Sequence, residues 1–200
     1  MRITHLLATL VLVAGTNLAI AQNKVFKIGG GSPAQQLAQV ESVTDFETFT
    51  GRTHKVTGSI NFDPKTSIGS GKIVVDAASI DTGIALRNDH MNSSTWLDTA
   101  KHPNITFETL NVRKTGADTY KVYGKFTMKG VTKNITTEVK LKYRKESAET
   151  RNAGFKGDVV QVRTSFQVKL ADYGVTIPAP AKDKVAPTVT ISLAVYGQTG

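Results

Sequence analysis

Few side chains in this chain have the types and spacing that catalysis requires. Beyond residue 21 the histidines are His54, His90 and His102, and the chain contains no cysteine. It also contains no G-x-S-x-G or H-E-x-x-H sequence, so local spacing assembles neither a nucleophile with its general base nor a zinc site. We therefore expect no catalytic residue, no metal and no cofactor, and we predict that the protein is not an enzyme.

Arg87 and His90 form the one pair whose spacing suits recognition of a polar group. Residues three apart on a helix lie on neighbouring faces of one turn, so the two side chains could contact the same polar head group of a ligand, such as a diphosphate or a quinone carbonyl. The alternative is structural. Arg87 would then pair with Asp89 or Asp98, and His90 would make a hydrogen bond beneath the helix.

This pair lies in a segment that interrupts a strand-like pattern. The chain on both sides alternates apolar and polar residues, whereas residues 87–98 do not, and they contain Met91, the only tryptophan, Trp96, and Leu97. We predict a short helical insert over 87–98 that acts as a lid, plug or site. Its apolar side chains either line a cavity or close one end of a core.

The first residues have the pattern of a secretory signal peptide. Arg2 provides a basic start, residues 6–14 an apolar run, and Ala19 to Ala21 a small-x-small cleavage site. We predict a signal peptide over 1–21 and one domain over 22–200, exported to the periplasm or secreted, and soluble after cleavage near Ala21. Without cysteine the exported chain has no disulfides, so its core must supply the stability.

The charge is basic, with 25 Lys and Arg against 16 Asp and Glu. Removing Arg2 with the signal peptide leaves 24 against 16, a net charge of +8. Such an excess can draw a protein to anionic membranes or phosphate-bearing ligands; alternatively, it only keeps the outer face of a sheet soluble. We expect no nucleic-acid partner, because no aromatic stacking platform interleaved with arginines is visible.

Alternation with a period of two predicts roughly eight to ten antiparallel strands joined mostly by short turns. The clearest strands are 122–128, 135–143, 160–170 and 185–195; less regular ones are 25–28, 42–49, 56–62, 72–76 and 105–112. Long strands suit the tilted wall of a barrel better than a sandwich. One face of these strands is apolar, and its residues are Val122, Phe126, Ile135, Val139, Leu141, Val160, Val162, Phe166 and Val168.

If the strands run up and down, the turns sort into two ends. The loops 113–119 and 144–158 share one end. The insert before Ile105 shares the other end with the turn 129–133 and the loop 171–184. The second end gathers several cations and aromatic side chains, namely Arg87, His90, Trp96, Lys101, His102, Lys129, Lys133, Tyr173, Lys182 and Lys184. We predict that this end is the mouth of an apolar interior rimmed by cations.

Four sequence pieces in order resemble the YceI-like family of exported, lipocalin-like, polyisoprenoid-binding barrels. They are Ser79-Ile80-Asp81-Thr82, Arg87-Asn88-Asp89-His90-Met91, Pro103-Asn104-Ile105-Thr106-Phe107 and Gly124-Lys125-Phe126-Thr127-Met128-Lys129-Gly130-Val131-Thr132-Lys133. The chain departs from the family at Met91, where leucine is usual, and at Trp96-Leu97, where an aromatic pair is frequent. Both departures keep apolar bulk.

The resemblance implies an all-β, eight-stranded antiparallel barrel that binds a long isoprenoid, polyprenyl phosphate or quinone-type lipid without covalent attachment. The predicted cavity-lining residues are Met91, Trp96, Leu97, Phe107, Phe126, Val139, Leu141, Val162 and Phe166, with Arg87 and His90 as head-group candidates. We expect a monomer or homodimer that contacts a membrane surface or membrane protein transiently. The alternative is a barrel with a filled core that docks on a membrane redox or stress-response partner.

Overall fold

An antiparallel sheet of ten strand segments dominates the computed structural model, which describes residues 23–200. The strands are β1 (Lys24–Ile28), β2 (Gln36–Val43), β3 (Thr48–Thr53), β4 (Val56–Phe62), β5 (Gly69–Asp76), β6 (Asn104–Lys114), β7 (Thr119–Met128), β8 (Val131–Arg144), β9 (Val159–Lys169) and β10 (Thr188–Gln198). The helices are α1 (Ala85–Asn92) and α2 (Ala148–Asn152), with short 3₁₀ turns at Pro33–Gln35, Ala77–Ser79, Leu170–Tyr173 and Ala179–Ala181. The predicted signal peptide, 1–21, lies outside the described residues.

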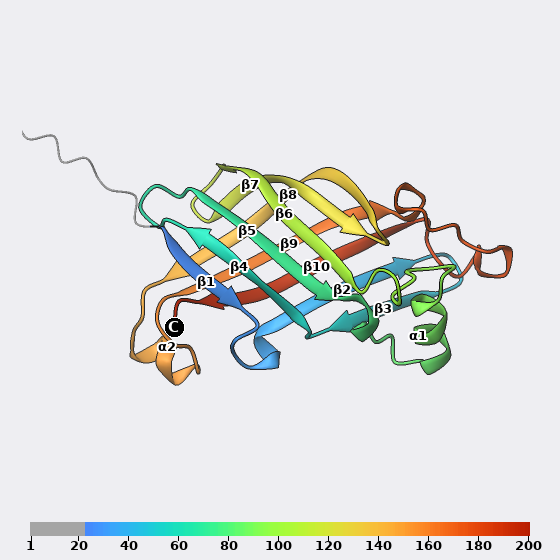
Figure 1. Cartoon of the computed structure of the whole chain (residues 1–200), viewed down its shortest axis with the longest axis horizontal. Helices are drawn as coiled ribbons and strands as arrows, with labels where there is room; N and C mark the ends of the chain where they lie inside the picture. Colours follow the sequence, from blue (N-terminus) through green and yellow to red (C-terminus); the bar gives the residue numbers. More distant parts are fainter. Residues whose placement is uncertain (1–22) are drawn as a thin grey trace, which may run out of the picture.

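The sheet closes on itself as a barrel (Figure 1). β1 and β2 both pair with β10, along successive parts of its length, and β4 and β3 pair with β1 and β2 in the same order. β1 with β2, and β3 with β4, therefore each act as one long, interrupted strand. Together with β5 to β10 they form a closed wall of eight antiparallel strands, which confirms the predicted all-β fold.

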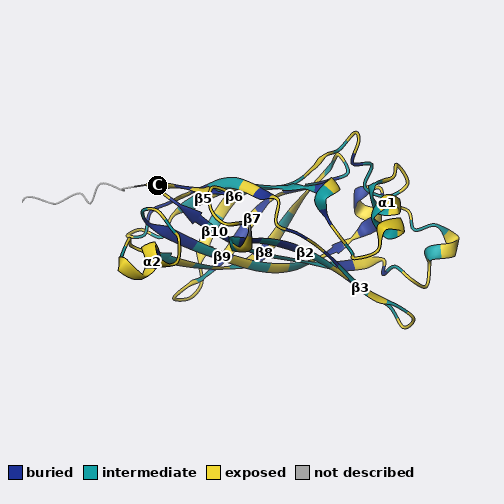
Figure 2. Ribbon diagram, turned by 90° about the horizontal axis from the view of Figure 1, so that it is seen from below, coloured by how far each residue is buried: buried dark blue, intermediate teal, exposed yellow. Residues whose placement is uncertain are grey.

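Alternation along each strand determines which side chains enter the barrel, as β7 illustrates. Tyr120, Val122, Phe126 and Met128 are buried in the interior, while the intervening lysines face outward. Successive strand residues point to opposite faces, so one period-two pattern fills the inside and solvates the outside. In Figure 2 the buried residues follow the barrel, where exposed ones alternate with them, and the loops at its two ends are largely exposed.

The predicted lid is a helix, but a shorter one that starts earlier than expected. α1 covers 85–92 rather than 87–98. It ends at Ser93, whose backbone N–H donates to the carbonyls of Asp89 and His90 and whose hydroxyl donates to His90 O at 2.7 Å. A serine that hydrogen-bonds backbone in this way competes with helix continuation. Residues 93–103 consequently form turns rather than a further helical turn.

The strand expected at 42–49 is wrong. Its middle is the tight turn between β2 and β3. There the Thr44 N–H donates to the Glu47 carbonyl at 3.0 Å, and the Thr44 hydroxyl accepts from the Glu47 N–H at 3.0 Å. This side chain forms a turn that hydropathy alone does not reveal.

The predicted sorting of the turns agrees with the strand order. α1, the β2–β3 turn, the β7–β8 turn and the β9–β10 loop lie at one end, which we call the mouth end, and α2 lies at the other (Figure 1). Two clusters of buried side chains fill these two ends. One surrounds Phe126 and Tyr173 at the mouth end, and the other surrounds Phe26, Val160 and Val195 at the α2 end.

A buried carboxylate, Asp158, joins the strands at the α2 end. It accepts hydrogen bonds from the Tyr143 hydroxyl at 2.7 Å and the Glu146 N–H at 2.8 Å, and it is paired with the ammonium of Lys24. Burial raises the pKa of Asp158, but the Lys24 ammonium, the Glu146 N–H and the Tyr143 hydroxyl outweigh it and hold the pKa at about 2. The ionised form is therefore the one that the fold stabilises.

Candidate functional site

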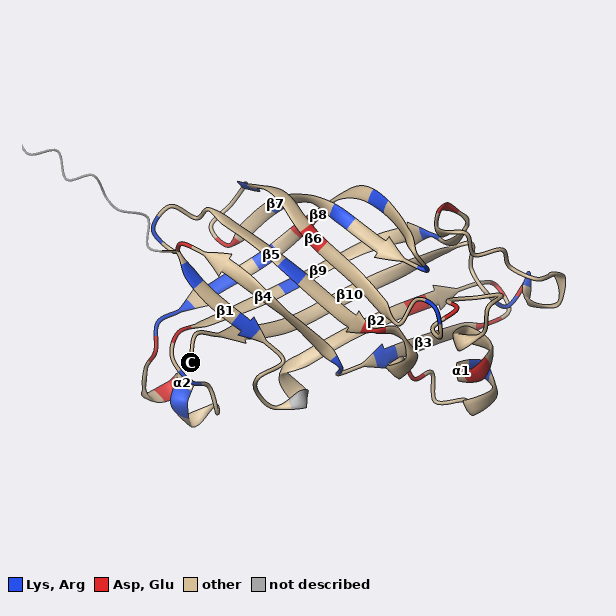
Figure 3. Cartoon of the chain, viewed as in Figure 1, with Lys and Arg blue, Asp and Glu red and all other residues tan. Residues whose placement is uncertain are grey.

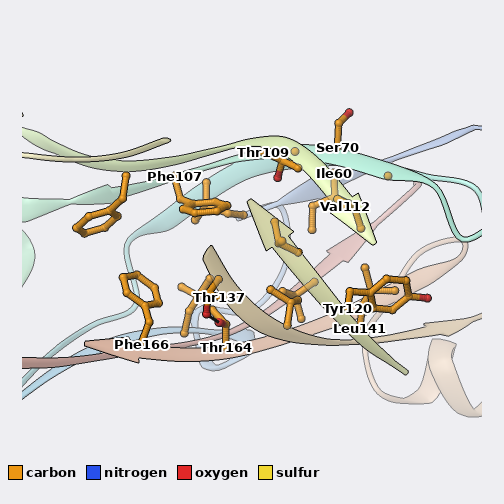
Figure 4. A pocket seen from close by; sticks show the side chains of 18 of the residues that line it. Ile60, Ser70, Phe107, Thr109, Val112, Tyr120, Thr137, Leu141, Thr164 and Phe166 are labelled. Carbon is orange, nitrogen blue, oxygen red and sulfur yellow. Dashed lines mark hydrogen bonds between the residues drawn. The ribbon is translucent and has the colours of Figure 1, made fainter. Parts of the chain in front are cut away.

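The middle of the barrel contains an apolar cavity of about 140 Å³, which we call the bore. Phe107, Phe126, Val139, Leu141, Val162 and Phe166 all line it, so six of the nine predicted cavity residues face the same space. Figure 4 shows Phe107 and Phe166 on opposite walls, with Leu141 further along the cavity. The polar side chains in the lining are hydroxyls such as Thr137 and Thr164, which satisfy each other at 2.8 Å.

A glycine makes room for one of these wall residues. Gly124 lies opposite Thr109 in the β6–β7 register, and a Cβ atom at Gly124 would lie 2.4 Å from Cζ of Phe107 and 2.5 Å from the Glu108 carbonyl oxygen. Only a residue without a side chain lets the Phe107 ring lie across the neighbouring strand. Gly124 therefore sets the position of Phe107 in the bore wall.

A larger cavity of about 440 Å³ lies beneath α1 and is called the mouth cavity here. Its lining includes Arg87, His90, Met91, Trp96 and Leu97, the other five predicted site residues. They approach from the α1 segment, while the opposite walls come from β2, β3 and the β9–β10 loop. A volume in the range of 300–1,000 Å³ and a mostly apolar lining are typical of ligand sites.

The two cavities adjoin. Ile105 on β6 and Ile191 on β10 line both of them. Close by, the Phe126 ring packs edge to face against Phe166 at 5.3 Å and against Tyr173 at 5.4 Å between ring centroids. These rings pack in the same cluster as Ile105 and Ile191, where the linings of the two cavities meet.

Hydrogen bonds hold α1 over the mouth cavity. The Asn88 amide oxygen accepts from the Thr82 N–H at 2.9 Å and from the Thr82 hydroxyl at 2.7 Å, while the Asn88 amide nitrogen donates to Asp81 at 2.7 Å. The Gly83 N–H, followed by the Asn88 amide, lowers the pKa of Asp81. Asp81 also pairs through its backbone with Arg52 of β3. The Asp81-Thr82 and Asn88 pieces of the family motif thus anchor the helix to the barrel.

Arg87 has a partner that neither sequence interpretation named. Its guanidinium pairs with Glu47 at the β2–β3 turn and lies 4.4 Å from the ring centroid of Phe49. Asp98 pairs instead with Lys101. The alternative pairing of Arg87 with Asp89 or Asp98 is therefore wrong, since the true partner is 40 residues away in sequence. The cation–π contact and the ion pair tie α1 to β3 across the mouth cavity.

The predicted cationic rim is also wrong. The segments at the mouth end, 44–47, 77–103, 129–133 and 170–187, contain six cations and seven acids, namely Arg87, Lys101, Lys129, Lys133, Lys182 and Lys184 against Asp45, Glu47, Asp81, Asp89, Asp98, Asp172 and Asp183. Figure 3 shows both signs at this end and lysines and arginines along the strands, where most of them are exposed. The net positive charge therefore lies on the wet face of the sheet.

Sequence reasoning placed Lys184 at this end but missed other residues of the mouth cavity, among them Glu47 and Phe49. These two lie in a turn and near a strand end, where no periodic pattern assigns a direction to a side chain. Lys184 also lines this cavity, and it takes part in none of the ion pairs formed within residues 23–200. His90 lies exposed at the edge of the same cavity.

No group of three or more His, Cys, Asp or Glu side chains in residues 23–200 is placed to hold a metal ion. In the same range, no helix is both long and apolar enough to span a membrane.

A closed eight-stranded antiparallel barrel with an apolar interior and a helix over one end defines a lipocalin-like class of proteins. Residues 32–196 match the YceI-like domain, and the chain belongs to the YceI-like family. The chain is 33% identical to a UPF0312 protein of Pseudomonas aeruginosa (strain LESB58) over 138 residues, which make up 68% of each chain. A UPF0312 protein of Azotobacter vinelandii is 33% identical over 120 residues, and this chain spans 59% of that relative.

Solved structures share the fold at lower identity. BcnA of Burkholderia cenocepacia is 23% identical, with a TM-score of 0.69 over 83% of this chain and 98% of that one. A polyisoprenoid-binding domain from Saccharophagus degradans, implicated in plant cell wall breakdown, is 19% identical, with a TM-score of 0.64 over 88% of this chain and 98% of that one.

Proposed function

We propose that this protein is an exported, non-catalytic lipid-binding protein that sequesters or carries a long isoprenoid or a similar amphiphile. One observation carries the proposal. A mouth cavity of about 440 Å³ adjoins a bore of about 140 Å³, and Ile105 and Ile191 line both of them. A wide vestibule followed by a narrow apolar passage fits a molecule with a head and a slender tail. The polyisoprenoid-binding domain of S. degradans, which shares the fold, supports this choice of ligand.

Binding would occur by partition rather than by chemistry. Each methylene group moved from water into an apolar cavity contributes about 0.8 kcal/mol. A few buried isoprene units therefore reach micromolar affinity with little help from the head group. The aliphatic residues of the bore wall, such as Val139, Leu141 and Val162, supply this contribution.

The charges of the mouth cavity narrow the choice of head group. Glu47 already balances Arg87, so a diphosphate would bring its negative charges close to that carboxylate. We assign Arg87 to holding α1, and His90 and Lys184 to the head group. A quinone or a singly charged phosphate fits this set better than a diphosphate. Within the described residues, Lys184 is the mouth-cavity lysine or arginine that stays outside an ion pair, so it can balance one negative charge.

The proposed compartment is the periplasm or the exterior of the cell, where a carrier would cross water between membranes as a monomer or dimer. This part of the proposal rests on the signal-peptide pattern over 1–21 and on no described residue. A transient contact with a membrane surface or membrane protein would load and unload the lipid.

Mass spectrometry of an organic extract tests the proposal. The protein is purified from its native compartment without detergent, and we expect a stoichiometric long-chain lipid. A clean extract that stays clean after incubation with isoprenoids would favour the filled barrel that docks on a membrane partner.

A matched pair of variants tests the lining of the bore. Val139→Glu places a carboxylate in the apolar space, whereas Lys140→Glu places it on the outer face of the same strand. Burying a carboxylate in an apolar site costs several kcal/mol, so we expect Val139→Glu to weaken isoprenoid binding more than tenfold. Lys140→Glu should leave binding unchanged, and circular dichroism checks that both variants fold.

A further inference from the structure

The barrel wall has a slit between β5 and β6. In the described residues the β5–β6 ladder runs from Asp76 opposite Asn104 to Lys72 opposite Glu108. The first three residues of β5, 69–71, pair with β4 but not with β6. At this level β6 carries a bulge between Thr109 and Asn111, and a bulge bends a strand and ends its pairing.

The bore reaches this slit. Its lining includes Gly69, Ser70 and Gly71 on one edge and Thr109 and Val112 on the other. In Figure 4, Ser70 and Thr109 lie along the same side of the cavity, and the Ser70 side chain points away from it. The two glycines have no side chain with which to cover the opening.

Apolar residues border the slit on the outside. Ile68, just before β5, is 65% exposed, and Leu110, at the bulge, is 46% exposed. At the end of the slit nearest α2, the ammonium of Lys114 donates to the Ser67 hydroxyl at 3.2 Å. The slit thus ends, towards the mouth end, where Lys72 lies opposite Glu108 in the β5–β6 ladder. Towards α2 it ends at the hydrogen bond between Lys114 and Ser67.

Buried side chains fill the barrel towards α2, among them Phe26, Val160 and Val195. A chain that enters from the mouth cavity and is too long for the bore must therefore stop or turn sideways.

We infer that the bore opens sideways through the β5–β6 slit and that the far end of a long apolar chain leaves the barrel there, covering Ile68 and Leu110. The inference rests on the proposed lipid-binding function. Along β6, Thr109 at the slit lies four residues beyond Ile105, which is at the junction of the two cavities, a distance of about 13 Å at 3.3 Å per residue. The protein would then accept chains much longer than its cavities.

A plug at the slit tests this inference. Thr109 faces Gly124 across the β6–β7 ladder, so Thr109→Phe would project a ring into the end of the bore. Thr136→Phe, on the exposed outer face of β8, is the matched control. The probes are prenols of three and of nine isoprene units, with dissociation constants measured by fluorescence competition.

We expect Thr109→Phe to weaken binding of the long prenol about tenfold or more, as loss of two buried methylene groups would, and to leave the short prenol within twofold. Thr136→Phe should change neither. Equal effects of Thr109→Phe on both prenols, or none on either, would overturn the lateral opening.

A photoreactive long prenol, labelled at its far end, tests the wild-type protein and does not depend on a variant that folds. Peptide mapping should find adducts at 68–71 and 109–112. Adducts confined to the mouth cavity or to interior residues such as Val122 would overturn the opening while leaving lipid binding intact. Failure of both prenols to bind the wild-type protein would instead overturn the proposed function.

Discussion

Replacing Asp158 by Asn removes the charge that joins β1, β8 and β9 at the α2 end. The pKa of Asp158 is about 2, against an ordinary value of 3.8. At 1.36 kcal/mol per pH unit this difference sets an upper bound of about 2.4 kcal/mol on the stabilisation from ionised Asp158. The carboxylate lies near the end of the barrel, and water screens its pairing with the half-exposed Lys24, so we expect about 1–2 kcal/mol.

The pH dependence follows from the direction of this pKa. The folded state lowers the pKa of Asp158, so the stabilisation is fully present above pH 3.8 and is lost as the pH falls towards 2. The assay is urea unfolding of the wild type and Asp158→Asn at neutral pH and at intervals down to pH 2. We expect a difference in unfolding free energy of about 1–2 kcal/mol at neutral pH that shrinks towards zero near pH 2.

Asp118→Asn is the control, because Asp118 is an exposed carboxylate in the β6–β7 turn. It should unfold like the wild type throughout, and other carboxylates titrate equally in all three proteins. A difference between Asp158→Asn and the wild type that stays constant from neutral pH to pH 2 would refute the assignment of the charge. So would the absence of any difference at neutral pH.

Three further substitutions probe the helix, the bore wall and the head-group position. Asn88→Ala removes three hydrogen bonds to Thr82 and Asp81 and should lower the unfolding free energy by about 1–3 kcal/mol in urea; an unchanged value would show that α1 is held otherwise. Gly124→Ala forces Phe107 and the β6 backbone apart and should cost about 1–3 kcal/mol in the same assay, with Gly116→Ala in the β6–β7 turn as its control. Lys184→Glu should weaken binding of a polyprenyl phosphate about tenfold in fluorescence titration and leave a neutral prenol unaffected, and equal losses for both would remove Lys184 from the head-group position.

The strands could be predicted because their signal is local. Each long strand repeats apolar and polar residues with a period of two, and the barrel uses that period directly, as β8 and β9 show. The 42–49 segment could not be predicted in the same way, because its turn depends on the Thr44 side chain rather than on hydropathy. The end of α1 at Ser93 has the same kind of cause.

In the candidate site, too, the strand residues could be predicted and the contacts made by loop residues could not. The six bore residues follow from which face of a strand they occupy, and all six line the bore. The five residues from the insert lie in the mouth cavity, but the partner of Arg87 comes from a turn 40 residues earlier. No local pattern connects Arg87 with Glu47, because loop positions have no periodicity to fix where a side chain points.

The sequence by itself determined the class of fold, the apolar character of the interior and the family, because these depend on periodicity and short motifs. Only the tertiary structure decided that the interior holds two adjoining cavities, that the mouth end is close to neutral in charge, and that β5 and β6 part at Gly69–Gly71. These features depend on how strands distant in sequence pair and on how their side chains fill the space between them. Register and packing belong to the closed barrel as a whole and to no single segment.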